Sequence, residues 1–178
     1  MRTRCASLLV LGFAILVAPA LASPIVVDNG TPPVTLSGGW ASATGATQHF
    51  GTVSSYALAG GAVDRATFEG NLSRSGQYEV EAWNSCYPNR STAVPHEVTH
   101  ADGVDIVLIN QDPSSGVCGA WDSLGTYRFE AGPARVEISD AGVSDGAYIG
   151  ADAVRFTQVE GLRVTACLLY TSPSPRDL

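Results

Sequence analysis

Apolar and polar residues alternate over short stretches through the middle of the chain. Ala66, Phe68 and Leu72 are separated by polar positions, and Tyr78 and Val80 follow the same two-residue period. Successive side chains of a strand point to opposite faces, so this period predicts strands with one buried face. Further strand-like runs cover residues 25–27, 97–100, 104–109, 127–129, 135–138 and 153–156.

Turn-forming residues separate these runs, as in Asp28-Asn29-Gly30, Ser75-Gly76 and residues 131–133. After the first 22 residues, no ten-residue stretch carries apolar side chains at the spacing of an amphipathic helix. Short strands separated by turn signals are typical of sandwiches and jelly rolls. We therefore predict an all-β fold, a jelly-roll-like antiparallel β-sandwich.

The first 22 residues form the pattern of a secretory signal peptide. Arg2 and Arg4 precede an uncharged apolar run at 8–17, and Ala20-Leu21-Ala22 is a small-x-small cleavage site. The apolar run is shorter than the roughly 20 residues of a membrane span. We expect cleavage after Ala22 and an exported chain; the alternative is a retained anchor.

The last residues, 167–178, resemble the translation of a sequencing adapter rather than protein sequence. We therefore expect one domain over residues 23–166 and a natural protein that continues beyond Ala166. Any catalysis would then lie in further domains. The alternative is a genuine Ser/Pro-rich tail, which would not add to the folded core.

Charge and composition narrow the function classes. The 178 residues carry a formal net charge of −7, and none of the ten basic residues is Lys. Nucleic-acid binding depends on a basic surface, so this class is excluded. Only 15% of the residues are charged and the chain contains 19 Gly, which suits a turn-rich β domain.

Two cysteines, Cys86 and Cys118, remain after Cys5 leaves with the signal peptide and Cys167 is assigned to the tail. Two cysteines in an exported domain favour a disulfide. A metal pair is the weaker alternative, because neither cysteine has a CxxC partner.

Residues 96–100 match the HExxH motif of zinc peptidases. That chemistry requires both histidines one turn apart on a helix. Here Pro95 precedes a β-branched segment, and residues four apart on a strand lie about 13 Å from each other. We therefore expect His96 and His100 to share a strand face with Val98, and we expect no enzyme active site in this domain.

Several patches of sequence, in order, form one pattern. They are 25–29 (IVVDN), 39–42 (GWAS), 76–83 (GQYEVEAW), 89–91 (NRS), 100–103 (HADG), 110–111 (NQ), Trp121, 124–127 (LGTY), 138–140 (ISD) and 151–156 (ADAVRF). This pattern resembles the golvesin C-terminal-like domain, also described as the carbohydrate-binding-like domain of xanthan lyase. The resemblance covers 25–156 and implies a jelly-roll sandwich of the kind that accompanies secreted bacterial enzymes and cell-surface proteins.

Aromatic residues near the two cysteines are the candidate ligand site, because sugar rings pack their C–H faces on aromatic side chains. Trp83 lies three residues before Cys86, and Trp121 lies three residues after Cys118. Bridged Cα atoms lie about 5.5 Å apart, so both tryptophans should lie on neighbouring loops. The predicted binding residues are Trp83, Tyr87, Arg90 and Trp121, with Asn110 and Gln111 as polar support. The alternative is that the tryptophans close the end of the core and the polar residues hold the loops.

Acidic residues at the turns are weaker candidates for a calcium site. Asp28, Asn29, Asp140, Asp145 and Asp152 flank the first and last strands and could coordinate calcium. Such residues are more often turn formers, and no EF-hand spacing is present.

Together these features predict a secreted, extracellular, non-catalytic module, at the bacterial surface or in the periplasm, that binds polysaccharide or a cell-surface glycan. The alternative is a structural or interaction module that packs on a neighbouring domain or the cell surface without binding glycan. We expect no nucleic-acid partner, no cofactor and no membrane span after cleavage.

Overall fold

The computed structural model describes residues 23–30, 34–44, 48–114, 116–144 and 146–159. The predicted signal peptide and the adapter-like tail lie outside these residues. The described part contains no helix, and so none long and apolar enough to cross a membrane. Its twelve strands are β1 (Ile25–Asp28), β2 (Val34–Ser37), β3 (Ala41–Ala43), β4 (Ser54–Leu58), β5 (Arg65–Leu72), β6 (Gly76–Trp83), β7 (Val94–His100), β8 (Gly103–Ile109), β9 (Trp121–Phe129), β10 (Gly132–Ser139), β11 (Tyr148–Ala151) and β12 (Ala153–Val159).

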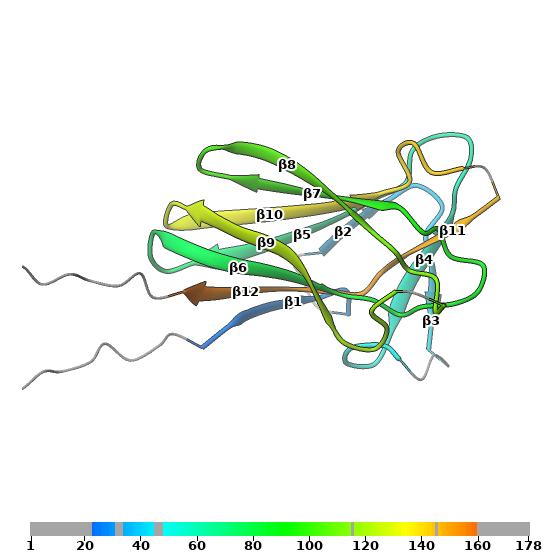
Figure 1. Ribbon diagram of the computed structural model, residues 1–178, viewed down its shortest axis with the longest axis horizontal. Helices are drawn as coiled ribbons and strands as arrows, with labels where there is room; N and C mark the ends of the chain where they lie inside the picture. Colours follow the sequence, from blue (N-terminus) through cyan, green and yellow to red (C-terminus); the bar gives the residue numbers. More distant parts are fainter. Residues whose placement is uncertain (1–22, 31–33, 45–47, 115, 145, 160–178) are drawn as a thin grey trace, which may run out of the picture.

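Two antiparallel sheets form the sandwich, in the orders β1-β12-β6-β9 and β2-β5-β10-β7-β8 (Figure 1). A smaller sheet, β11-β4-β3, lies at one end of it (Figure 1). Strands distant in sequence pair as neighbours, as β1 does with β12 and β5 with β10. The predicted all-β antiparallel sandwich is confirmed.

The core forms where the alternating apolar residues of the two sheets meet. Tyr78, Val80 and Ala82 of β6 are 3%, 0% and 0% exposed, and Phe68 of β5 and Val136 of β10 are fully buried. Each apolar side chain removed from water stabilises the fold by about 1.5–3 kcal/mol, so this two-residue period is what brings the sheets together.

The HExxH segment lies in strand β7, as the sequence predicts. His96 is fully buried between Val94 and Val98, and its Nδ1 lies 3.0 Å from the Val94 carbonyl oxygen. His100 is less deeply buried and stacks on Tyr127 with ring centroids 4.8 Å apart. The two histidines therefore belong to a strand rather than to a zinc-binding helix.

The two ends of the described chain lie side by side at one end of the sandwich. Ile25 pairs with Phe156 across the antiparallel strands β1 and β12; β1 runs toward the three-stranded sheet and β12 runs away from it (Figure 1). At that far end, Ala153 pairs with Trp83, and Trp83 pairs with Trp121. The predicted site therefore lies at the end of the sandwich opposite Ile25 and Val159.

Candidate functional site

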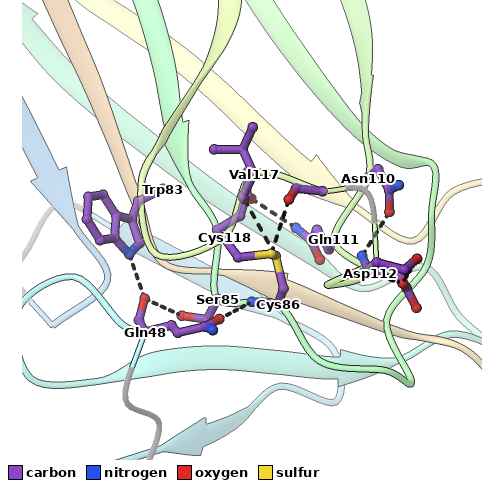
Figure 2. The surroundings of a disulfide bond; sticks show 12 residues. Gln48, Trp83, Ser85, Cys86, Asn110, Gln111, Asp112, Val117 and Cys118 are labelled. Atoms are coloured by element: carbon purple, nitrogen blue, oxygen red, sulfur yellow. Dashed lines mark hydrogen bonds between the residues drawn. A yellow bond between two sulfur atoms is a disulfide. The ribbon is translucent and has the colours of Figure 1, made fainter.

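A disulfide joins the loop after β6 to the loop before β9. Cys86 and Cys118 are bridged with their Cα atoms 5.3 Å apart, which confirms the predicted pair. Gln48 accepts hydrogen bonds on its carbonyl oxygen from Trp83 Nε1 and from Ser85 Oγ, and on its side chain from Cys86 N. Figure 2 shows Gln48 and Trp83 on one side of the disulfide and Asn110 to Asp112 on the other.

Three partly buried rings form the tryptophan cluster, defined by Phe50, Trp83 and Trp121. Their centroids lie 5.2–5.5 Å apart, with the two indoles 5.4 Å apart in an edge-to-face arrangement. The structure corrects one expectation: both tryptophans lie on strands, because Trp83 ends β6 and Trp121 begins β9 directly across the ladder. Strand pairing therefore brings the two indoles together in addition to the disulfide.

A charged pair covers part of this cluster. The Arg155 guanidinium lies 4.4 Å from the centroid of the Trp121 ring and forms an ion pair with Glu81 at 2.5 Å. Arg155 and Glu81 face each other across β12 and β6 on the outer face of the sheet. A cation over an indole face is favourable, so this pair holds the orientation of Trp121.

A second group, the arginine–tyrosine cluster, consists of Arg90, Tyr56, Tyr87 and Tyr148. The Arg90 guanidinium lies 5.3 Å from the ring centroids of Tyr56 and Tyr87 and 5.9 Å from that of Tyr148. Arg90 itself is 8% exposed. The six predicted residues thus do not form one continuous row: Trp83 and Trp121 meet in one cluster, and Tyr87 and Arg90 meet in the other.

The two predicted amide residues, Asn110 and Gln111, form hydrogen bonds to other groups of the protein. Gln111 is 1% exposed; its Nε2 donates to Asn84 Oδ1 and to the Gly150 carbonyl, and its Oε1 accepts from Gly150 N at 2.7 Å. Asn110 Oδ1 accepts from Asp112 N at 2.8 Å. Gln111 therefore supports the loops from a buried position that a ligand does not reach.

Of the predicted acidic turn residues, Asp28, Asn29 and Asp152 are neighbours where β1 pairs with β12, whereas Asp140 lies in the turn after β10. Asp140 accepts from Asp64 N, whereas Asn29 N donates to the Asp152 carbonyl at 2.9 Å, and Asp145 lies outside the described residues. In the described ranges, no three His, Cys, Asp or Glu side chains are grouped so that they could hold a metal ion. Asp28, Asp140 and Asp152 each accept a hydrogen bond from a backbone N–H, whereas the Asn29 side chain donates to Ser55 Oγ and to the Ala151 carbonyl.

Asp152 is the buried carboxylate of this region, 2% exposed. Its Oδ2 accepts from Ser85 Oγ at 2.8 Å and from Phe50 N at 3.1 Å. Burial raises the pKa of Asp152 to about 6, even though both hydrogen bonds act in the opposite direction. Asp152 thus links the loop that carries Phe50 to the disulfide loop.

Sequence reasoning missed Phe50, Tyr56 and Tyr148, which complete the two clusters. No local pattern marks them, because they reach the site through pairing between distant segments: Tyr148 through β11 with β4, and Tyr56 on β4 itself.

Comparison with known proteins identifies the family. The golvesin C-terminal domain matches residues 25–158, nearly the whole described chain. The chain belongs to the golvesin C-terminal domain family. The resemblance carried by the sequence motifs is confirmed.

This golvesin-type domain is similar to part of a much longer enzyme. Xanthan lyase of Bacillus sp. (strain GL1) is 37% identical over 146 residues, which cover 79% of this chain and 15% of the relative. A Paenibacillus xanthan lyase structure matches with a TM-score of 0.69 and 33% identity, over 77% of this chain and 13% of that one. The chain thus spans about 15% of the length of its curated relative.

A more distant structural match shows the fold alone. The Podospora anserina GH26-CBM35 β-(1,4)-mannanase matches with a TM-score of 0.58 at 14% identity, over 78% of this chain and 28% of that one. The sandwich architecture is therefore shared with a segment of another polysaccharide-active enzyme.

Proposed function

We propose that this golvesin-type domain is a secreted, non-catalytic module that binds polysaccharide and accompanies a larger extracellular protein. The observation that carries the proposal is the tryptophan cluster: three partly exposed rings gathered at one end of the sandwich. Aromatic faces with polar neighbours are the surface on which sugar rings pack.

The position of the cluster supports this function. Ile25 and Val159 lie at the opposite end, so a neighbouring domain joined there leaves Trp83 and Trp121 accessible. The relation to a segment of xanthan lyase supports polysaccharide as the ligand class. The disulfide supports an extracellular location, since such bonds persist in oxidising compartments.

The non-catalytic assignment is supported by the placement of the HExxH residues. His96 is fully buried inside the sandwich, and His100 packs on Tyr127. Neither histidine is available to hold a water molecule beside a substrate bond. Catalysis, if the natural protein has any, belongs to other domains.

A second function, an interaction module, is favoured by one row of side chains on the edge strand β8. Val104, Ile106 and Leu108 are 53%, 62% and 61% exposed and lie on one face of the strand. An exposed apolar row on a sheet edge is a feature of surfaces that pair with another chain or domain. Loss of glycan binding in every assay below, together with self-association, would favour this function.

Affinity electrophoresis of the purified chain tests the proposal. Gels contain xanthan, polyglucuronate, polygalacturonate, mannan, galactan or dextran, and retardation measures binding. We expect Trp121→Ala to weaken retardation more than tenfold while circular dichroism shows an intact fold. Tyr127→Ala is the matched control, because Tyr127 lies on the same strand about 20 Å away. Equal retardation of Trp121→Ala and the wild type would reject the tryptophan cluster as the binding surface.

A further inference from the structure

The most buried arginine of the described chain lies in the arginine–tyrosine cluster. Backbone contacts fix its position: Arg90 bridges to Tyr148, Ser91 N donates to the Tyr148 carbonyl, and Tyr148 N donates to the Asn89 carbonyl. The guanidinium then lies among three aromatic rings, and its Nη1 donates to the Ile149 carbonyl at 3.1 Å. The loop after the disulfide thus directs one cation into the end of the sandwich.

This cation has no carboxylate partner among the described residues. Arg65 and Arg135 share Glu137, Arg128 pairs with Glu130, and Arg155 pairs with Glu81, yet no ion pair there includes Arg90. Arg90 Nε is buried and has no hydrogen-bond partner. A buried charge is costly unless it is paired, and three ring faces offset only part of that cost.

Burial lowers the pKa of Arg90, and the neighbouring tyrosines act in the opposite direction. A guanidinium nevertheless stays protonated at neutral pH. The cluster therefore holds a permanent positive charge that is 8% exposed, beside three partly exposed tyrosine rings whose faces can contact the C–H face of a sugar.

We propose that the arginine–tyrosine cluster is a subsite for a carboxylate-bearing sugar, so that the module prefers acidic polysaccharides. This inference rests on the proposed function. The sugar carboxylate accepts hydrogen bonds from the Arg90 guanidinium, a geometry that arginine favours. Tyr87, which lies on the loop rather than on a strand, packs against the sugar ring.

The net negative charge of the chain means that a preference for acidic polysaccharides cannot come from long-range electrostatic attraction. A chain of net charge −7 repels polyanions in general, so long-range attraction does not produce it. Preference for a carboxylated sugar must come from direct contact with one cation, and it must persist where salt screens distant charges.

The experiment compares each polysaccharide that retards the wild type with its carboxyl-reduced form, in about 0.15 M salt. We expect the wild type to bind the carboxylated form at least tenfold more tightly. Arg90→Lys keeps the charge but loses the planar donors and should reduce that preference severalfold, and Arg90→Gln should abolish it. Arg128→Gln, which removes an exposed cation distant from the cluster, is the control and should bind as the wild type does.

The outcomes separate the inference from the function. Equal binding of both forms by the wild type overturns the carboxylate subsite while carbohydrate binding stands; this measurement needs no variant, so misfolding of an Arg90 variant does not obscure it. An unchanged preference in folded Arg90→Gln also overturns the subsite. If the wild type binds none of the polysaccharides, both the proposed function and the carboxylate subsite are rejected.

Discussion

Buried His96 should make the stability of the domain depend on pH in a specific direction. Full burial lowers its pKa from 6.5 to about 4, while its bond to the Val94 carbonyl acts weakly in the opposite direction. Between pH 6.5 and pH 4, His96 is therefore protonated in the unfolded chain and neutral in the folded chain. This histidine stabilises the fold fully above pH 6.5, and that stability is lost as the pH falls toward 4.

The magnitude follows from the interval between the two pKa values. One pKa unit corresponds to about 1.4 kcal/mol, so protonation of His96 in the unfolded chain costs the fold about 3 kcal/mol by pH 4. His96→Leu removes the titrating ring and keeps a side chain of similar size between Val94 and Val98. We expect its free energy of unfolding, relative to the wild type, to rise by about 3 kcal/mol from pH 7 to pH 4.

Urea unfolding followed by tryptophan fluorescence at pH 4, 5, 6 and 7 measures this difference. Val98→Ala is the matched control: it lies on the same face of β7 and has no titrating group, so it should lower stability equally at every pH. Parallel curves for His96→Leu and the wild type would refute the reasoning, because they would mean that the buried imidazole accepts a proton in the folded state.

Further predictions concern other buried or constrained positions. The pKa of Asp152 is raised to about 6, so the stability that this carboxyl contributes is present below about pH 4 and is lost as the pH rises through 6. The free energy of unfolding of Asp152→Asn, relative to the wild type, should rise by about 2 kcal/mol between pH 4 and pH 6 in urea titrations. Replacing Cys86 and Cys118 by Ser opens a link between residues 32 apart in sequence and should lower the free energy of unfolding by about 3–4 kcal/mol, and an unchanged urea midpoint would show that the loops stay ordered without it. Gly38 has a φ of 100°, and a Cβ there would lie 1.8 Å from a carboxylate oxygen, so Gly38→Ala should cost more than about 2 kcal/mol. Gly142 has a φ of 77° and nothing within 4 Å of an added Cβ, so Gly142→Ala should lower the free energy of unfolding by only about 1 kcal/mol. Equal losses of stability for the two glycine variants in thermal melts would show that the contact with the carboxylate at Gly38 has no effect.

Much of the fold could be predicted from local patterns. The alternation of Tyr78 and Val80 with polar residues placed them in the core, and the same alternation placed His96 on a buried strand face. The two cysteines could be paired because the other two fall in the predicted signal peptide and in the adapter-like tail. Their spacing from Trp83 and Trp121 then predicted that the indoles would be neighbours.

The candidate site could be predicted only in outline. Arg90 was expected beside the tryptophans on an open rim, yet it lies among three tyrosines with 8% of its surface exposed. Two of those tyrosines belong to β4 and β11, whose pairing depends on how the ends of the sandwich close. Gln111 has the polar side chain of a surface residue, and its burial follows from three hydrogen bonds that no sequence pattern specifies.

The amino-acid sequence by itself predicted eight of the twelve described strands, the disulfide and the family, because each of these depends on spacing along the chain or on residue type. The short strands β2, β3, β4 and β11 carry no such pattern and were not predicted. The tertiary structure alone decided which rings meet, that the buried arginine of the described residues has no carboxylate partner, and which amides are buried. Those contacts join residues far apart in sequence, as Arg90 Nη1 does with the Ile149 carbonyl. They arise from sheet register and loop closure, and the preferences of neighbouring residues do not encode such long-range geometry.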